Sequence, residues 1–387
     1  MVIYAKNFSE SMRKLIIDAS NLRAGGGIIH LQNIFQVGDP QAHGFQKVIV
    51  YGGQNPLEHF PKKSWLDLRE IRKLNRSFLH RLQWQHSQLG RLAEQEQALL
   101  FIPGGLYLGK YRPYVTMFQN MQIFETPEKN REGLTNEWLR LSLLHLGQAK
   151  TFRHCSGLIC LSEYSQSYLQ QFYPHLLKNV EVRRISHGIS QFDENSKDYE
   201  LKNPVQLLYV STVKQYKHQW HLIDAVAQLK REGYSLELHL IGSGDQPALK
   251  QMKEAIRRHS DLGEFAHYHG GLSHHETMKW YGEADLFVFP SSCETFGISL
   301  LEAMASALPI ACSDRGPMPE VLRDAGCYFN PEQPKSIAAS LKMLLDDKTL
   351  RQRLGRKALE YSQKYTWERC AQETFSFLQS VHQRHCS

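Results

Sequence analysis

Two glutamates lie on either side of a glycine where an apolar run of the sequence gives way to a helical pattern. Glu294 falls in the loop after the run 286–289, and Glu302, eight residues later, falls about one turn inside the helix expected over 298–305. The free N–H groups at the start of such a helix attract a phosphate, and Gly297 lets a ligand approach the backbone closely. A carboxylate beside that phosphate can accept hydrogen bonds from sugar hydroxyls. Considered alone, two glutamates at this spacing are better explained without a ligand, as one acid that caps the helix and one solvated side chain.

The longer string around these residues resembles the E-x7-E signature of the retaining GT-B glycosyltransferases of family 4. The resemblance rests on Glu-Thr-Phe-Gly-Ile-Ser-Leu-Leu-Glu-Ala-Met-Ala at 294–305, with Phe-Pro-Ser before it at 289–291 and Pro-Glu-Val after it at 319–321. It is close over about 207–370 and looser over the first half. It implies two Rossmann-like domains that face a cleft. It also implies retaining transfer of a hexosyl-type sugar from a nucleotide-sugar to a hydroxyl of a glycan or glycolipid, in a bacterium for lipopolysaccharide or capsule assembly.

The resemblance assigns roles in the second half of the chain by position. Glu302 would hold the nucleotide ribose, and Glu294 would contact the donor sugar. The start of the helix would receive phosphate or sugar oxygens of the donor, and its residues are Phe296, Gly297 and Ile298.

A lysine after the strand expected over 206–210 completes this half of the site. Lys217 occupies the family's lysine position and should reach the donor diphosphate, where an ammonium stabilises charge on the departing phosphate. Ser211, directly after the strand, is expected to bind the donor, and Thr212 stands where the family commonly has an arginine. Lys217 and Glu294 are therefore the expected catalytic residues, with a solvated lysine before a helix as the alternative for Lys217.

The first half contributes a glycine cluster and an asparagine. Gly25, Gly26 and Gly27 follow the first strand pattern and open a helical one. They allow close approach to a ligand, although they lack GxGxxG spacing and a flexible turn is the alternative. By resemblance they lie against the donor phosphates and the acceptor. Asn120, where relatives often carry a histidine, can hydrogen-bond a sugar hydroxyl but cannot act as a base. Acceptor deprotonation is then left to the donor's own phosphate or to an unidentified group.

No metal or other cofactor is expected, because the nucleotide-sugar is itself a substrate. No Asp-x-Asp triplet occurs in the chain, so the usual carboxylate pair that holds a metal on a donor diphosphate is missing. Histidines cluster at 267–275, but no Cys or Asp joins them at ligand spacing. This favours packing or solvated histidines over a metal site.

Short apolar runs alternate with helical patterns along the chain, which is typical of α/β domains with parallel sheets. A polar segment at 193–204 has linker composition. We expect an acceptor-side domain over 1–190, a nucleotide-sugar-binding domain over 204–370, and a last helix, about 371–387, packed back on the first domain. Strands are expected at 14–19, 47–51, 98–102, 114–118, 157–161, 206–210, 235–241, 265–269, 286–289, 309–312 and 326–329, and helices at 66–92, 139–152, 220–232, 247–259, 274–281, 298–305 and 334–347, with a helix pair from 348 onward.

The excess positive charge is confined to the first half. Residues 1–190 hold 23 Lys and Arg against 14 Asp and Glu, whereas the whole chain has a net charge of +7. Such a basic half suggests an acidic partner. Within the helical pattern 66–92, the basic residues at one helical face are Arg69, Arg72, Lys73 and Arg76. This helix either packs on the core with a solvated basic face or docks on an anionic membrane surface.

Composition and cysteine use indicate the compartment. A chain of 387 residues with 42% hydrophobic and 22% charged residues is neither disordered, collagen-like nor a disulfide miniprotein. Seven scattered cysteines, no membrane-length apolar window and no secretory signal favour a cytoplasmic protein, peripheral on the cytoplasmic face of the membrane if the basic surface docks there.

Other functions stay open at this point. A nucleotide-sugar epimerase of the same architecture fits the fold, although the string 294–302 suits transfer better. An NAD-dependent dehydrogenase lacks its GxGxxG, and a phosphorylase lacks a context for a pyridoxal-binding lysine. A non-catalytic nucleic-acid-binding protein is suggested only by positive charge. We expect no nucleic-acid partner, and tight, salt-sensitive binding to DNA or RNA would overturn that expectation.

Overall fold

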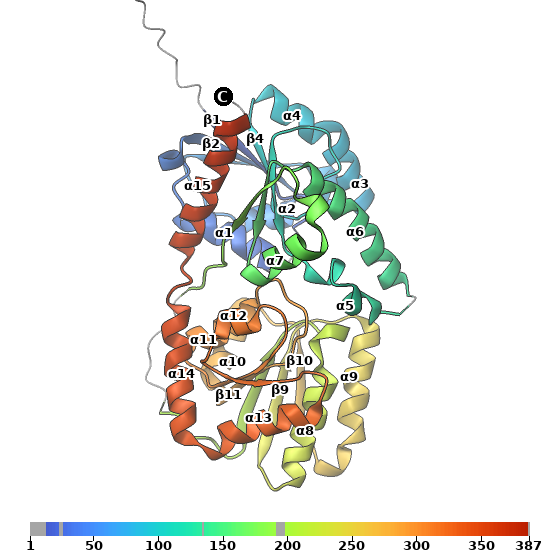
Figure 1. The fold of residues 1–387 in the computed structure, drawn as a ribbon, viewed down its shortest axis with the longest axis vertical. Coiled ribbons are helices and arrows are strands. Elements are labelled where there is room, and N and C mark those ends of the chain that lie inside the picture. The colour runs from blue at the N-terminus through green and yellow to red at the C-terminus, as the bar shows by residue number, and fades with distance from the viewer. Residues whose placement is uncertain (1–12, 23–25, 134, 191–197, 386–387) are drawn as a thin grey trace, which may run out of the picture.

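The computed structural model describes residues 13–22, 26–133, 135–190 and 198–385. Its strands form two separate sheets, each with helices packed around it, and Figure 1 shows one domain above the other along the long axis. The first sheet has seven strands in the order β3-β2-β1-β4-β5-β6-β7, and the second has six in the order β10-β9-β8-β11-β12-β13. Two Rossmann-like domains are thus confirmed.

The central strands of the first sheet are apolar and buried, which is the pattern of a parallel sheet covered on both faces. The edge strands β3 and β7 are polar and only partly buried, and no apolar run predicted them. The bounds are β1 Arg13–Asp18, β2 Phe45–Gly52, β3 Leu66–Glu70, β4 Leu99–Ile102, β5 Tyr114–Phe118, β6 Gly157–Cys160 and β7 Glu181–Arg184.

The second sheet follows the predicted strands to within one residue at each end. β8 and β11 are neighbours at its centre, so the loops that follow them leave the sheet side by side. In open α/β sheets a ligand site forms at this carboxyl edge. The bounds are β8 Val205–Val210, β9 Leu236–Ile241, β10 Ala266–Gly270, β11 Leu286–Phe289, β12 Ile310–Ser313 and β13 Cys327–Phe329.

The helices connect successive strands. None of those in the described ranges is long and apolar enough to cross a bilayer. The first domain contains α1 Gly26–Val37, α2 Gln54–Glu58, α3 Phe78–Trp84, α4 Gly90–Gln95, α5 Thr126–Asn130, α6 Asn136–His154 and α7 Glu163–Phe172. The remainder are α8 Gln219–Arg231, α9 Gln246–Arg258, α10 His274–Glu283, α11 Ile298–Ala305, α12 Met318–Leu322, α13 Pro334–Asp346, α14 Lys348–Ser362 and α15 Trp367–His385.

The prediction of one long basic helix over 66–92 is wrong. The backbone of 66–70 instead pairs with β2 along the edge of the sheet as β3. On β3, the Arg69 guanidinium donates hydrogen bonds to Tyr51 and Asp67. The four basic residues therefore share no helix face: Arg69 lies on the strand, Arg72 and Lys73 on a 3-10 helix, and Arg76 in the connection to α3.

The last helix returns to the first domain. α14 lies on the second domain, and α15 runs beside the first (Figure 1). Phe375 of α15 is so close to Gly38, just after α1, that a Cβ there would lie 2.6 Å from the ring. Arg384 pairs with Glu181 of β7 at 2.9 Å. Where α15 begins, Trp367 packs on His187, with 4.5 Å between ring centroids. The chain passes between the domains twice, once after β7 near His187 and once at the start of α15. These two segments meet here, and we call this contact the joint.

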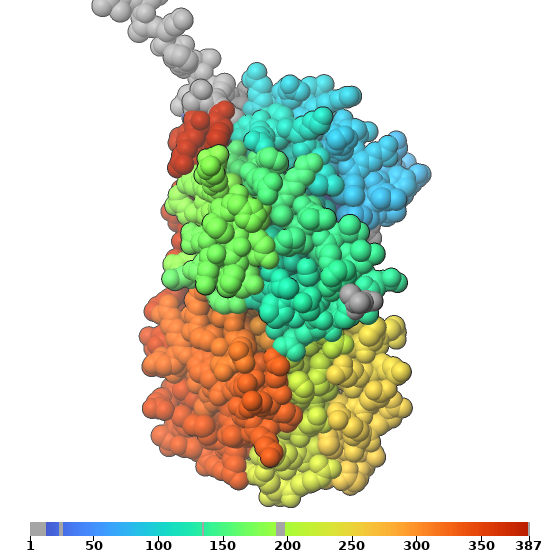
Figure 2. Space-filling view, turned by 45° about the vertical axis from the view of Figure 1, so that its right-hand side comes forward, coloured from blue at the N-terminus to red at the C-terminus, as the bar shows by residue number. Residues whose placement is uncertain are grey.

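Residues around α5 and α6 form a second contact between the domains, away from that joint. Figure 2 shows this part of the first domain lying directly against the second. Arg131, just after α5, pairs with Glu332, and Lys214 lies 3.6 Å from Glu137 of α6. The two domains therefore meet on both sides of the region between their facing sheet edges.

Candidate active site

The loops after β8 and β11 bring Lys217 and Glu294 together. The Nζ of Lys217 donates to Oε1 of Glu294, and the two side chains are only 8% and 17% exposed. A buried ammonium without a partner would cost several kcal/mol, so this carboxylate compensates it. The ring of Tyr216 adds a cation–π contact at 4.9 Å from Nζ. The pair is a fixed, compensated charge at the carboxyl edge of the second sheet.

Neighbouring hydrogen bonds tie the two loops to each other. Ser292 donates its backbone N–H to the carbonyl of Tyr216 at 2.9 Å, and its hydroxyl lies 2.9 Å from Nε2 of His218. His218 adopts a left-handed backbone with φ of 53° and begins α8. Burial lowers the pKa of His218 to about 3, so its ring is neutral at physiological pH. These contacts set the position of the ion pair.

Glu302 is buried inside α11. Its Oε2 accepts a hydrogen bond from the Tyr281 hydroxyl at 2.9 Å, and Oε1 lies 3.8 Å from Nδ1 of His274. Burial raises the pKa of Glu302 to about 7, against the lowering effect of Tyr281. The carboxyl therefore changes its charge close to neutral pH. A titratable, nearly enclosed acceptor of this kind at a sheet edge is typical of a ligand site.

The start of α11 has no side-chain cap. Gly297 stands at the N-cap position with φ of 93°, a left-handed conformation that a residue with a Cβ rarely adopts. The first N–H groups of the helix have no partner within the helix itself. They and the positive end of the helix dipole form a place for an anion, beside Glu294.

The glycines of the first domain lie against this helix start. A Cβ on Gly26 would be 3.0 Å from Cδ1 of Ile298, and one on Gly27 would be 3.6 Å from Oε1 of Gln119. At Gly26, any larger side chain would press on α11. Gly25 lies outside the described residues. The structure thus places Gly26 of the first domain beside α11 of the second, and Gly27 beside Gln119.

Asn120 and Ser211 were also expected in the site, and both lie near it. Asn120 is half-buried at the start of a 3-10 helix, and it is its neighbour Gln119 that faces the glycines. The Gln119 carbonyl accepts from Thr295 of the second domain at 3.4 Å. Ser211 is half-buried and donates its hydroxyl to the carbonyl of Thr212 at 3.2 Å.

Phe296 points into the joint rather than the cleft. Its ring is 2% exposed and packs on His187 and Tyr365, with centroids 6.3 and 5.5 Å apart. The side chain therefore couples α11 to the joint, and only the backbone of Phe296 stands where a ligand could meet it.

A buried glutamate of the first domain reaches the same loop and was not predicted. Glu125 accepts from the hydroxyl of Tyr164 and from the thiol of Cys293, which precedes Glu294. Burial raises the pKa of Glu125, and these hydrogen bonds lower it in part. Nothing in the sequence around Glu125 indicated this contact, because the two partners come from distant segments.

Asp18 is a second buried carboxyl that was not predicted, although its position in the sequence could have indicated it. It ends the apolar strand β1 shortly before the glycine cluster, a position at the carboxyl edge of a sheet where ligands bind. Asp18 is 2% exposed and accepts from Nε2 of Gln85 and from the backbone N–H of Ser20 at 2.9 Å. Burial raises its pKa.

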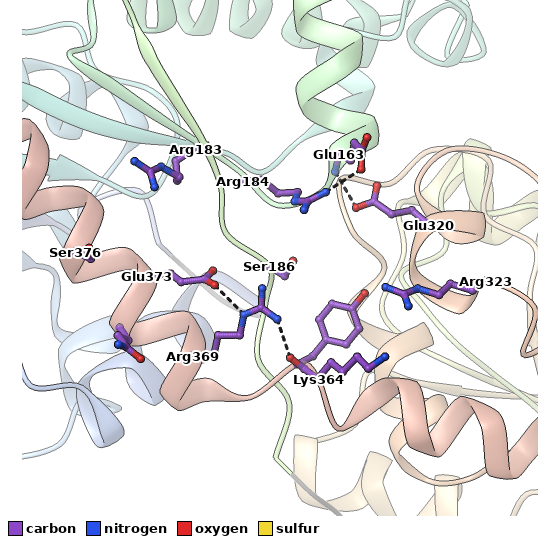
Figure 3. Close-up of a pocket in the computed structure, with 12 residues that line it drawn as sticks. Glu163, Arg183, Arg184, Ser186, Glu320, Arg323, Lys364, Arg369, Glu373 and Ser376 are labelled. Atoms are coloured by element: carbon purple, nitrogen blue, oxygen red, sulfur yellow. Dashed lines mark hydrogen bonds and ion pairs between the residues drawn. The ribbon is translucent and has the colours of Figure 1, made fainter.

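A charged pocket of about 860 Å³ lies at the joint, between α7, α12 and α15 (Figure 3). At its rim the carboxylate of Glu320, from the second domain, accepts the backbone N–H groups of Glu163 and Tyr164 at 2.8 and 2.9 Å. It therefore caps the start of α7 of the first domain. Arg184 pairs with Glu163 at 2.8 Å beside this cap. Glu320 is a direct link between the domains.

Within the described part of the chain, no three His, Cys, Asp or Glu side chains are grouped so that they could hold a metal ion. Of the histidines clustered at 267–275, His269 packs with its ring centroid 4.5 Å from that of Trp280, whereas His274 and His275 are exposed.

Comparison with known proteins agrees with this geometry. Residues 191–361 match the family described as Glycosyl transferases group 1. The O-antigen chain mannosyltransferase B of Escherichia coli is 23% identical over 272 residues, which are 68% of this chain and 69% of that protein.

Solved structures show the same fold over nearly the whole chain. The sucrose-phosphate synthase of Thermosynechococcus elongatus superposes with a TM-score of 0.75 at 16% identity, covering 96% of this chain and 100% of that one. The Anabaena protein Alr3699/HepE, solved in complex with UDP-glucose, superposes with a TM-score of 0.69 at 17% identity, covering 95% and 99%. The chain therefore has the GT-B fold, and its residues 191–361 are similar to the group 1 glycosyltransferases.

Proposed function

We propose that this protein transfers a sugar from a nucleotide-sugar donor to a hydroxyl of a glycan or glycolipid, with retention of anomeric configuration. The observation that carries the proposal is the ion pair of Lys217 and Glu294 beside the uncapped start of α11. The ion pair and the helix start together bring a fixed cation, free backbone donors and a sugar-binding carboxylate to one point. Those are the groups that a departing nucleoside diphosphate and its sugar require.

The donor would lie along the carboxyl edge of the second sheet. Its ribose hydroxyls would donate to Glu302, four residues inside α11. Its diphosphate would meet the helix start and the ammonium of Lys217, which stabilise the charge that develops when the sugar–phosphate bond breaks. Gly26 and Gly27 would close the site from the first domain.

Glu294 would hold the sugar hydroxyls rather than attack the sugar, because its carboxylate is engaged by Lys217. The acceptor hydroxyl would then approach on the face that the diphosphate leaves, and a phosphate oxygen would take its proton. Retention follows from attack on that same face. We propose that no divalent metal is needed, since Lys217 and α11 supply the positive charge.

The wider role rests on the relatives. A structural neighbour was solved with UDP-glucose, and a relative is an O-antigen mannosyltransferase. We propose a nucleoside-diphosphate hexose as donor and a part in surface polysaccharide assembly at the cytoplasmic face of the membrane.

A nucleotide-sugar panel tests the proposal. Thermal shift identifies the donors that bind, and release of free nucleotide is then measured with and without candidate acceptors. We expect acceptor-dependent release that survives EDTA, and a product whose anomeric NMR coupling matches the donor configuration. Conversion of the donor sugar to its epimer without an acceptor would show an epimerase instead. An inverted product, or activity lost in EDTA and restored by magnesium, would overturn the mechanism.

A further inference from the structure

Exposed apolar side chains are concentrated on two helices of the first domain. The described residues expose eight large hydrophobic side chains, and five of them lie on α3 and α6. Contiguous apolar patches of this kind mark interaction sites on soluble proteins. The five, with their exposed fractions, are Phe78 42%, Leu79 73%, Leu139 53%, Leu143 61% and Leu146 67%.

Between these helices lies an apolar groove of about 820 Å³. α3 and α6 form its walls on one side of the first domain (Figure 1), and the loop after β4 forms its floor. Gly147 of α6 makes room for that floor, since a Cβ there would be 2.7 Å from Cδ1 of Leu106. We call this the α3–α6 groove; the residues used below are Phe78, Leu82, Leu106, Leu139 and Leu143.

α3 connects the groove to a buried polar cluster. Phe78 and Leu82 face the groove, whereas Arg81 is turned inward and its Nε donates to Oδ1 of Asn21 at 3.3 Å. In the π-helical turn that continues α3, Nε2 of Gln85 donates to Asp18 and to the carbonyl of Leu106 at 3.2 Å. Leu106 therefore joins both sites, with its side chain in the groove and its carbonyl in the cluster.

The polar cluster has unused hydrogen-bonding capacity next to the glycine loop. Nδ2 of Asn21 and Oε1 of Gln85 are buried and have no hydrogen-bond partner among the described residues. Gln85 is 0% exposed. Buried polar atoms are nearly always paired, so a donor and an acceptor aimed here fit the polar group of a ligand. Asn21 precedes Gly26, which borders α11.

We propose that the acceptor is an amphiphile whose hydrocarbon chain lies in the α3–α6 groove, with its polar head towards the Asn21–Gln85 cluster. This rests on the proposed glycosyl transfer and names the class of its acceptor. Leu106 of the groove follows β4, on the side of the carboxyl edge of the first sheet, where the acceptor hydroxyl must arrive. A hydrocarbon chain is the ligand that such leucine walls favour.

The charge around the groove suits an anionic head group. Arg140 lines the groove and pairs with Glu137 at 2.6 Å, and Arg72 and Lys73, outside its lining, are exposed just before α3. The domain has a strong excess of basic residues, which attracts anions over longer range. A hydrocarbon chain joined to its polar head through a phosphate, which these basic residues would attract, is therefore the preferred form of the acceptor.

The test uses alkyl phosphates and alkyl glucosides of four, six and eight carbons, below their critical micelle concentrations, titrated into the full chain by calorimetry. We expect each added methylene to tighten binding about 3–4-fold. We also expect the phosphates to bind more tightly than the glucosides at low salt. The double variant Leu139→Gln/Leu143→Gln should bind the octyl compounds at least tenfold more weakly. Met343→Gln, an equally exposed apolar residue on the second domain, should bind them as the wild type does.

Three outcomes would overturn the inference. The first is binding that does not depend on chain length, and the second is wild-type affinity in the double variant. The third is a wild-type dimer in sedimentation equilibrium that the double variant converts to a monomer, because a second copy would then occupy the groove. Donor binding is measured on the same samples. If the donor binds normally while chain length has no effect, only this inference fails; if no nucleotide-sugar binds the wild type, the proposed function fails.

Discussion

Lys217 and Glu294 form a nearly buried ion pair although 77 residues separate them in the sequence. Neither loop alone could hold a charge there, because each charge needs the other to offset its desolvation. The pair also sets a limit on any mechanism for this site. Glu294 cannot serve as a free nucleophile while Lys217 holds it, so the ammonium and the carboxylate act together on the donor.

Replacing Lys217 should remove the main fixed cation of the site. We expect Lys217→Ala to lower turnover about 100–1,000-fold, the usual cost of losing one preorganised donor. Single-turnover release of nucleotide measures this effect separately from product release. Lys214→Ala is the matched control, since Lys214 is a neighbouring lysine paired with Asp245 at 2.7 Å. An equal loss in both variants would show that Lys217 has no special role.

Removing Glu294 should affect the sugar more than the nucleotide. We expect Glu294→Ala to lower turnover while the dissociation constant of the free nucleotide stays within a few-fold of the wild type, because Glu294 would touch only the sugar. Calorimetry with nucleotide, and then with nucleotide-sugar, compares the two contributions. Loss of free-nucleotide binding would instead place Glu294 at the diphosphate.

Glu302 should make donor binding depend on pH near neutrality. Its ionised form accepts ribose hydroxyls better, so donor affinity should rise as pH rises through about 7, the raised pKa of this buried carboxyl. Glu302→Gln should remove the pH dependence, and Glu302→Ala should weaken donor binding about tenfold or more, as for a hydrogen bond to a charged group. Calorimetry between pH 6 and 8 measures both effects, and an unchanged pH profile in Glu302→Gln would remove Glu302 from the donor site.

The same carboxyl gives the stability of the fold a definite sign of pH dependence. The folded protein holds the Glu302 proton more tightly than the unfolded chain, whose carboxyl titrates near 4.5. The free energy of unfolding contributed by this group therefore falls as pH rises from about 4.5 to 7. Urea unfolding across this range should show a weaker fall in Glu302→Gln than in the wild type.

Gly26 should tolerate no large side chain while Ile298 stands opposite it. A Cβ on Gly26 would already lie 3.0 Å from Cδ1 of Ile298. Gly26→Val should displace α11 from the first domain and lower kcat/KM about 100-fold, the scale of a 1 Å misplacement. Ile298→Ala in the same chain should restore part of the loss. Gly282→Val is the control, because a Cβ at Gly282 would meet nothing within 4 Å. No rescue would mean that the two residues do not oppose each other in the working enzyme.

Glu320 should stabilise the contact between the domains at the joint (Figure 3). Its carboxylate accepts two backbone N–H groups at the start of α7, and replacing a helix cap costs about 0.5–2 kcal/mol. We expect Glu320→Ala to lower the free energy of unfolding by this amount and to widen the molecule in small-angle scattering. Glu368→Gln, on the exposed surface of α15, should do neither. A stability unchanged in Glu320→Ala would show that the cap contributes nothing in solution.

The central strands of both sheets and the helix that bears the glutamates could be predicted from local sequence patterns. β5, β11 and α11 fall at the predicted residues, because a parallel strand buried on both faces must be a short apolar run. The glycine at 297 likewise marks the start of α11, since only a residue without a side chain adopts its left-handed backbone easily.

Features that depend on contact with a distant segment could not be predicted from sequence patterns. Residues 66–70 have a helical pattern but form β3, because pairing with β2 supplies the backbone hydrogen bonds at the sheet edge. Glu125 meets Cys293, and Gly26 meets Ile298, only because the domains face each other. The exposed leucines of α3 and α6 read as ordinary helix faces in the sequence. Local patterns report which residues are buried, whereas contacts across the cleft are set by how the two domains pack, and no single segment encodes that arrangement.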